Sequence, residues 1–304
     1  MSNIIEVKNF TKQYGNFNAV NDISFEVAEG SIFAFLGPNG AGKSTTINTL
    51  CTILNKTQGT LKINGNDVSE HKDRVRKDIG IVFQESTLDV KLTVYENLKL
   101  HCDFYNVPKG EVKERIDFVL NLVDLNDWRK ATVNTLSGGM KRRVEIARGL
   151  VHYPKVLFLD EPTTGLDPQT RASIWNYIHK LQKQKNITIF LTTHYMDEAE
   201  ISDKVAIMDH GKIVAYDTPD NLKKQYTSSL MKIKASDLKP IIQYLLSEGI
   251  KYKIVDEIIS IYITDLNEVF EITAGFKDYI TDVEITKGTL NDVFLAITGK
   301  EIRE

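Results

Sequence analysis

The stretch Gly37-Pro38-Asn39-Gly40-Ala41-Gly42-Lys43-Ser44 follows a mostly apolar run at 31–36 and precedes a segment with helical spacing. It fits the pattern G-x-x-x-x-G-K-[S/T] of a loop that binds phosphate, and we call it the phosphate loop. Glycines let the backbone approach a ligand, and consecutive backbone amides supply the dense donors that a triphosphate needs. The pattern predicts that Lys43 contacts the β- and γ-phosphates and that the Ser44 hydroxyl binds Mg²⁺.

Two further apolar runs lie at 156–159 and 187–192. Short apolar runs of this kind are typical of parallel strands that are buried on both faces of a sheet. Helical patterns separate the runs, so the sequence predicts an α/β fold with a mixed, largely parallel sheet flanked by helices. The region at about 85–153 has a mostly helical pattern. It predicts a helical subdomain between the strand at 31–36 and the strand at 156–159.

Two acidic residues, Asp160 and Glu161, follow the run at 156–159. Ligands of open α/β sheets bind at the carboxyl ends of the strands, so both carboxylates are expected beside the phosphates. We predict that Asp160 holds Mg²⁺ through water and that Glu161 polarises the attacking water. The alternative is a strand that ends in two solvated acids.

Two other segments have the chemistry of phosphate contacts. His194 follows the run at 187–192, where it could hydrogen-bond a γ-phosphate, and the alternative is a capping or surface histidine. Ser137, Gly138 and Gly139 precede an amphipathic helix, whose first amides would form a second anion site. Alone, this triplet is more often a flexible turn.

The composition limits the remaining possibilities. The chain has 304 residues, of which 42% are hydrophobic, and a net charge of -3, which does not favour a surface that coats nucleic acid. Two cysteines, Cys51 and Cys102, make no disulfide framework and fit a reducing compartment. No apolar run reaches the roughly 18 residues of a membrane span, and the N-terminus lacks a signal layout. We therefore expect a cytoplasmic protein.

The last part of the chain has a pattern of its own. From 228 to 304 the order strand, helix, strand, strand, helix, strand and final helix predicts a small α+β domain of ferredoxin-like arrangement. The expected domains are therefore 1–227 and 228–304.

The order and spacing of these motifs along about the first 220 residues resemble the ABC ATPase family. The resemblance implies a P-loop NTPase core that hydrolyses ATP with Mg²⁺. The matching motifs are the Walker A loop at 37–44, the signature motif at 136–140, Walker B at 156–161, the D-loop at 165–167, the Q-loop glutamine Gln84, the switch histidine His194 and the adenine-stacking aromatic Tyr14.

The resemblance also implies a site shared by two chains that pack head to tail. The mate would be a second copy or a related ATPase subunit, and each ATP would lie between one Walker A loop and the other signature motif. The implied catalytic residues are Glu161, His194 and Lys43, and the implied Mg²⁺ ligands are Ser44, Gln84 and Asp160. The implied ATP-binding residues are Tyr14, Gly37, Asn39, Gly40, Ala41, Gly42, Lys43, Ser44, Thr45, Gln84, Ser137, Gly138, Gly139 and Asp167.

Motifs at 92–98, 193–200 and 289–295 resemble the daunorubicin/multidrug exporter branch of the family. This implies a separate multi-span permease that moves a drug, lipid, peptide or polysaccharide, no nucleic-acid partner, and a location on the inner face of the cell membrane. Two alternatives stay open. One is a soluble ABC ATPase outside transport; the type that acts on DNA would carry a long coiled-coil insert between Walker A and the signature motif, and the sequence has none. The other is an importer ATPase subunit, the nearest rival within transport.

Overall fold

The computed structural model describes residues 2–263 and 266–299, and their contacts divide the chain into two units. The division falls between Thr218 and Pro219, whereas we predicted a boundary between residues 227 and 228. The difference is helix α8 (Pro219–Tyr226), which packs against α11 (Leu290–Thr298) and therefore groups with the second unit.

A six-stranded sheet forms the centre of the first unit, in the order β10-β9-β3-β8-β7-β6. Strands β9, β3, β8, β7 and β6 run parallel to one another, and the edge strand β10 is antiparallel to its neighbour β9. The predicted fold class is therefore confirmed. The strands are β3 (Ile32–Leu36), β6 (Ile79–Val82), β7 (Val156–Asp160), β8 (Thr188–Thr193), β9 (Lys204–Asp209) and β10 (Lys212–Asp217).

A second, antiparallel sheet, ordered β2-β1-β4-β5, packs on the same core. We predicted strands only at 4–7 and 23–27, but β1 (Asn3–Tyr14) and β2 (Phe17–Ala28) pair over twelve residues each. Register shifts along this pair interrupt the strict alternation that sequence patterns depend on. The short strands β4 (Gln58–Ile63) and β5 (Asn66–Asp67) complete the sheet.

Aromatic rings fill the space between the two sheets. The ring centroid of Phe190 on β8 lies 5.0 Å from Phe33, 5.1 Å from Phe35 and 5.2 Å from Phe158, and Phe25 of the antiparallel sheet closes the cluster. All of these side chains are buried. Because burial of apolar area is the main favourable term in folding, this cluster ties the two sheets together.

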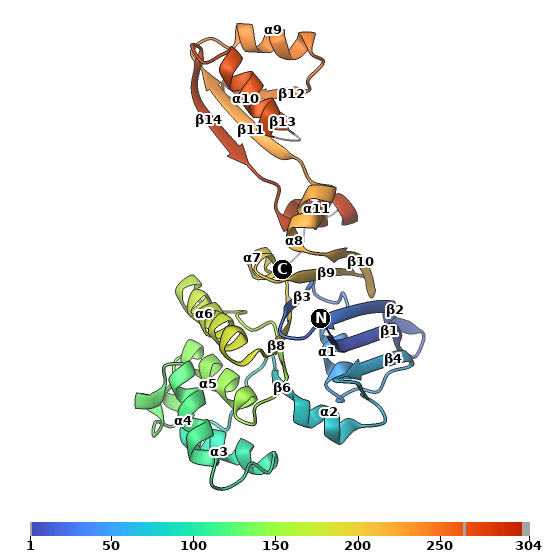
Figure 1. The fold of residues 1–304 in the computed structure, drawn as a ribbon, viewed down its shortest axis with the longest axis vertical. Helices are drawn as coiled ribbons and strands as arrows, with labels where there is room; N and C mark the ends of the chain where they lie inside the picture. Colours follow the sequence, from blue (N-terminus) through green and yellow to red (C-terminus); the bar gives the residue numbers. More distant parts are fainter. Residues whose placement is uncertain (1, 264–265, 300–304) are drawn as a thin grey trace. The chain divides into compact units, whose positions relative to one another are not determined.

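Helices α3 (Val94–Phe104), α4 (Val112–Leu122) and α5 (Gly138–Leu150) contact one another and form the predicted helical subdomain. Figure 1 shows them in green, apart from the blue antiparallel sheet. Their starts are set by capping side chains: Thr93 and Glu96 form a capping box on α3, and Ser137 caps α5. The other helices are α1 (Lys43–Leu50), α2 (Lys72–Asp78), α6 (Pro168–Lys185) and α7 (Met196–Glu200).

The two cysteines lie in the first unit, and both are buried free thiols. Burial raises the pKa of Cys51 well above its usual value and raises the pKa of Cys102 to about 11. In the part of the chain that the structure describes, no helix is both long and apolar enough to cross a bilayer.

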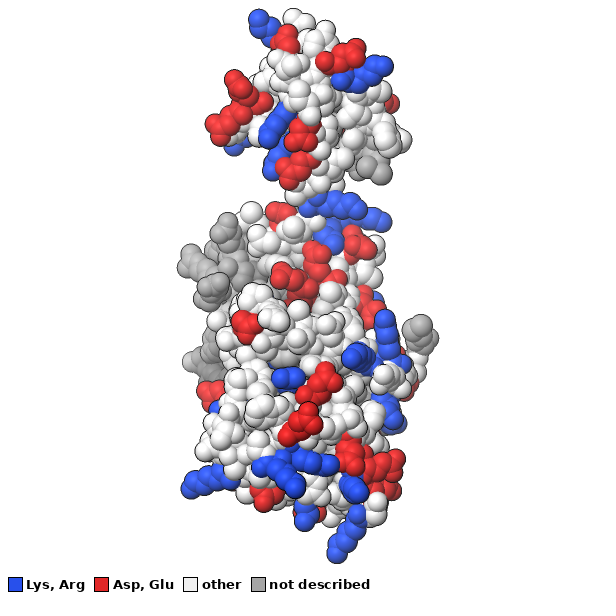
Figure 2. Space-filling view, turned by 90° about the vertical axis from the view of Figure 1, so that its left-hand side faces the viewer, with Lys and Arg blue, Asp and Glu red and all other residues white. Residues whose placement is uncertain are grey.

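The second unit has one antiparallel sheet in the order β12-β13-β11-β14. With the two intervening helices this is the βαββαβ order of a ferredoxin-like unit, as we predicted. Its core includes Met231, Ile233, Ile259 and Ile261 from the sheet. The elements are β11 (Ser229–Ala235), α9 (Lys239–Ser247), β12 (Tyr252–Val255), β13 (Ile258–Ile263), α10 (Leu266–Gly275) and β14 (Ile280–Thr286). On the face that Figure 2 draws, acidic and basic side chains are interspersed on each unit.

Replacing Phe190 with alanine removes the ring at the centre of the aromatic cluster. We expect the free energy of unfolding of the first unit to fall by about 3–5 kcal/mol, the usual cost of a buried Phe→Ala change. Urea denaturation followed by tryptophan fluorescence measures it, because Trp128 and Trp175 both lie in this unit. The control is Phe104→Ala, whose side chain is 70% exposed. Equal losses in the two variants would contradict the central role of the cluster.

Candidate active site

The phosphate loop lies between the end of β3 and the start of α1, and two of its glycines have no room for a side chain. A Cβ on Gly37 would lie 2.3 Å from the Met208 carbonyl oxygen. Gly42 has φ +105°, and its Cβ would lie 2.6 Å from the Ala19 carbonyl oxygen. Glycine is therefore required at both positions, for close packing at the first and for the left-handed turn into α1 at the second.

The Lys43 ammonium group is buried against the backbone of the phosphate loop. Its Nζ donates to the carbonyl oxygens of Gly37 at 2.7 Å and Pro38 at 3.1 Å, and it lies 3.6 Å from Glu161 Oε1. Burial lowers the pKa of Lys43, and the nearby carboxylates Glu161 and Asp160 offset part of that effect. These contacts hold the curved backbone of the loop together.

The structure brings Ser44 and Asp160 into direct contact across 116 positions of sequence. The Ser44 hydroxyl donates to Asp160 Oδ1 at 3.1 Å, and the Thr192 hydroxyl donates to the same oxygen at 2.5 Å. The carboxylate is buried, and among the described residues both of its hydrogen-bond donors are hydroxyl groups. A hydroxyl beside a carboxylate at the end of a phosphate loop is the oxygen donor set that suits Mg²⁺.

Glu161 is the point where the predicted catalytic residues converge. Its Oε2 accepts from Gln84 Nε2 at 3.3 Å and from the Thr164 hydroxyl at 3.2 Å. His194 Nδ1 lies 3.4 Å from the same oxygen and is a buried atom without a hydrogen bond to any part of the chain that the structure describes. Glu161 also has φ +46°, an uncommon backbone conformation for a residue with a side chain. A strained acid among polar groups is a frequent feature of active sites.

A cavity of about 360 Å³ opens over the phosphate loop. Tyr14 and Phe17, which pair across the end of the β1–β2 hairpin, form its aromatic end and are both exposed. We predicted Tyr14 but missed Phe17; the turn Gly15-Asn16 was the available signal, because a two-residue turn places its flanking residues opposite each other. The lining is Tyr14, Phe17, Ala19, Asn39, Gly40, Ala41, Gly42, Lys43, Ser44, Thr45, Gln84 and Glu161.

Five predicted ATP-binding residues do not line this cavity: Gly37, at the start of the phosphate loop, and Ser137, Gly138, Gly139 and Asp167. The last four lie close to one another instead. A Cβ on Gly138 would meet the Leu166 side chain only at 4.0 Å, and one on Gly139 would lie 2.4 Å from Thr170. Ser137 caps α5, and Asp167 caps α6 by accepting from the Thr170 amide at 2.9 Å. Within one chain, therefore, the signature motif and the D-loop lie next to each other and outside the cavity over the phosphate loop.

A buried carboxylate that we did not predict supports the histidine. Glu198, which is 1% exposed, accepts from the Thr193 hydroxyl at 2.6 Å, from Trp175 Nε1 at 3.3 Å and from the Thr163 hydroxyl. Thr193 directly precedes His194, and Thr163 follows Glu161 by two positions. The acid therefore ties together the two segments that carry these residues.

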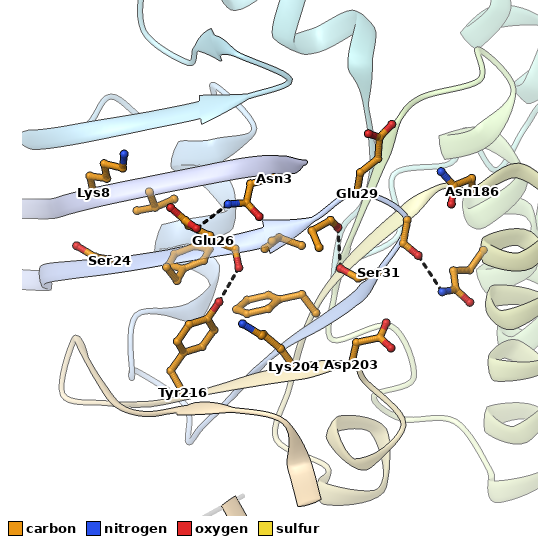
Figure 3. A pocket seen from close by; sticks show the side chains of 17 residues that line it. Asn3, Lys8, Ser24, Glu26, Glu29, Ser31, Asn186, Asp203, Lys204 and Tyr216 are labelled. Carbon is orange, nitrogen blue, oxygen red and sulfur yellow. Dashed lines mark hydrogen bonds between the residues drawn. The ribbon is translucent and has the colours of Figure 1, made fainter. Parts of the chain in front are cut away.

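A roomier groove of about 720 Å³ lies elsewhere on the first unit, along the end of β2 and the start of β3 (Figure 3). Its polar groups bond one another: Asn3 donates to Glu26 at 2.6 Å, Gln182 donates to the Gly30 carbonyl at 2.8 Å, and the Tyr216 hydroxyl donates to the Glu26 carbonyl at 2.7 Å. We assign no chemistry to this groove, because these groups already have partners.

A glycine-rich loop with a buried lysine, and two acids at the end of the neighbouring strand, define a P-loop nucleoside triphosphatase. The family model described as "ABC transporter" matches residues 20–164. The chain is 34% identical to the daunorubicin resistance ATP-binding protein DrrA3 of Streptomyces coeruleorubidus, over 98% of this chain and 97% of that protein. The chain belongs to the ABC transporter family, as an ATP-binding subunit that hydrolyses ATP.

Two other similarities agree with this assignment. The chain is 34% identical to the Nod factor export ATP-binding protein I of Ralstonia nicotianae, over 99% of this chain and 95% of that protein. Among solved structures, a dimeric ATP-binding cassette in a post-hydrolysis state, bound to ADP and Pi, superposes with a TM-score of 0.64 at 28% identity. That comparison covers 70% of this chain and 98% of the cassette.

Replacing Lys43 with alanine removes the ammonium group at the phosphate loop. We expect the dissociation constant for ATP to rise by about 10- to 100-fold, the effect of losing about 1.5–3 kcal/mol of charge-assisted hydrogen bonding. Titration with a fluorescent ATP analogue measures it. Lys99→Ala, at an exposed position on α3, is the control. An unchanged dissociation constant in Lys43→Ala would show that this lysine does not contact the nucleotide.

Proposed function

We propose that the chain is the ATP-driven subunit of an exporter and that it works as a head-to-tail pair. Each ATP would be held between the phosphate loop of one copy and residues 137–139 of its mate, which is a second copy or a related ATPase. The observation that carries this is the placement of the signature motif. It begins α5, a helix of 13 residues, yet it lies outside the cavity of its own chain.

The helix tip is suited to an anion from outside. Helix N-termini attract negative charge because their first amides lack partners within the helix. Among the described residues, the Ser137 side chain accepts from the Met140 amide, and a Cβ on Gly138 would meet only the Leu166 side chain, at 4.0 Å. A γ-phosphate bound there and at Lys43 would connect two chains, and its release after hydrolysis would remove that connection.

In the proposed reaction, Glu161 accepts a proton from the attacking water. The water oxygen bonds to the γ-phosphorus while the bond from that phosphorus to the bridging oxygen of ADP breaks, which yields ADP and phosphate. Lys43 neutralises the γ-phosphate oxygens, and His194 and Gln84 orient the water and the phosphate. The Mg²⁺ ion, held by Ser44, Asp160 and Gln84, would supply positive charge against the phosphate oxygens. We also propose that Tyr14 stacks on adenine and Asp167 completes the shared site.

Export through a separate multi-span permease is the finer part of the proposal. The names of two relatives refer to drug resistance and Nod factor export, and both match nearly the whole chain. The helical subdomain exposes Leu100 and Phe104, one turn apart on α3, as a partner surface would require. The chain would then lie at the inner face of the cell membrane, and the cargo would be a drug, lipid, peptide or polysaccharide chosen by the permease.

Co-purification tests this assignment. The tagged chain, extracted in detergent from its own cells, should carry a multi-span membrane protein in a fixed ratio, and the pair in vesicles should move cargo away from the ATP-containing side. A soluble partner alone would refute the transport role, and movement toward the ATP side would favour the importer alternative. We further propose that the second unit is a separate domain, which limited proteolysis near Thr218 would release intact.

Replacing Glu161 with glutamine keeps the shape of the side chain but removes its basicity. We expect ATP binding to persist, steady-state hydrolysis to fall by about 100-fold or more, and ATP to trap the closed pair. Phosphate release and size-exclusion chromatography with ATP measure the two effects. Glu96→Gln, at an exposed carboxylate on α3, is the control. Hydrolysis at the wild-type rate in Glu161→Gln would place the base elsewhere.

A further inference from the structure

Arg142, in the second turn of α5, forms several hydrogen bonds to the backbone of the candidate active site. The residue is 7% exposed. Its guanidinium nitrogens donate to the carbonyl oxygens of Pro162 at 2.6 Å, Asp160 at 3.2 Å, Glu161 at 3.2 Å and Phe83, and to Glu145 Oε2 at 2.9 Å. Four of these five acceptors are main-chain atoms.

These carbonyls belong to the two segments that carry the proposed catalytic groups. One segment is the end of β7 with Asp160 and Glu161, and the other is Phe83, which directly precedes Gln84. A guanidinium group is planar and always charged, with its donors in a fixed fork, so it holds several carbonyl oxygens in one geometry. Arg142 therefore fixes the backbone from which Glu161 and Gln84 project.

The same face of α5 holds the other end of the Gln84 segment. Glu145, one turn after Arg142, accepts from the Thr87 amide at 3.2 Å. Arg148, a further turn along, donates to the Thr87 carbonyl at 2.7 Å and to its hydroxyl. The three side chains are spaced three residues apart, so they lie along one side of the helix. Together they hydrogen-bond both ends of the segment 83–87.

We infer that Arg142 is a positioning residue that couples the signature helix to the base Glu161 and to Gln84. The inference rests on the proposed roles of these two residues and of the helix tip. A shift of α5 caused by phosphate at Ser137 would be carried by Arg142 to the carbonyls of Glu161 and Phe83, because four of its five hydrogen bonds end on main-chain carbonyls of these two segments. The base and the glutamine would then move with the helix that meets the other chain's ATP.

The test compares Arg142→Lys with Arg143→Lys. Lysine keeps the charge but has a single donor centre that cannot reach four carbonyls. Arg143 is the matched control: it lies on the same helix, but it bonds the Val123 carbonyl at 3.2 Å and the Tyr177 hydroxyl at 3.4 Å, away from the catalytic segments. Steady-state hydrolysis gives kcat and KM, and kcat is counted per folded chain from the stoichiometry of ATP binding.

We expect kcat of Arg142→Lys to fall by about tenfold or more while KM changes by less than about threefold, because the phosphate loop keeps its own contacts. Arg143→Lys should keep both values near those of the wild type. Equal kcat values in the two lysine variants would overturn the inference. If Arg142→Lys does not fold, Glu145→Gln replaces it, since its amide group faces the donors of Arg142; a wild-type kcat there would overturn the inference equally.

The result separates this inference from the proposed function. If Glu161→Gln abolishes turnover but Arg142→Lys matches its control, only the coupling role fails. If Glu161→Gln still hydrolyses ATP at the wild-type rate, the proposed base is wrong, whatever Arg142 does. A packing role alone would lower the unfolding midpoint of Arg142→Lys and leave kcat per folded chain unchanged, which also counts against the inference.

Discussion

A buried positive charge needs partners, and Lys43 finds them in the Gly37 and Pro38 carbonyls and in Glu161. The contact with Glu161 brings the phosphate loop and the end of β7 together. Both groups are nearly free of solvent, so each would be costly to bury alone. In the proposed function, phosphate oxygens of ATP would replace these contacts of Lys43, and Glu161 would then be available to the attacking water.

The parallel sheet makes this meeting possible. Strands β3, β7 and β8 are neighbours with one direction, so the phosphate loop, Asp160-Glu161 and His194 leave the sheet at the same edge. The aromatic cluster around Phe190 packs these strands against the antiparallel sheet and so fixes the position of that end of the sheet. The helical subdomain then reaches the edge through Arg142, which joins α5 to two of the segments that end there.

The phosphate loop could be predicted from sequence because its chemistry depends on residues that are neighbours in the chain. The strand that leads to Asp160 and Glu161 could be predicted as well, because both of its faces are buried and its sequence is therefore a continuous apolar run. The contacts of Arg142, Glu198 and Phe17 could not, because each depends on partners brought together by the fold. Arg142 reads as one more basic residue on an amphipathic helix. The grouping of α8 with the second unit also depends on the fold, since its packing on α11 joins residues more than sixty positions apart.

Burial of both native thiols has a practical consequence for spectroscopy. Cys51 and Cys102 have raised pKa values, so few thiolates are available to react with maleimides or nitroxide reagents near neutral pH. A single cysteine introduced on an exposed helix would therefore be the main reactive thiol of the folded chain, with no need to remove the native pair. Labels placed in this way would report distances between two copies through the nucleotide cycle.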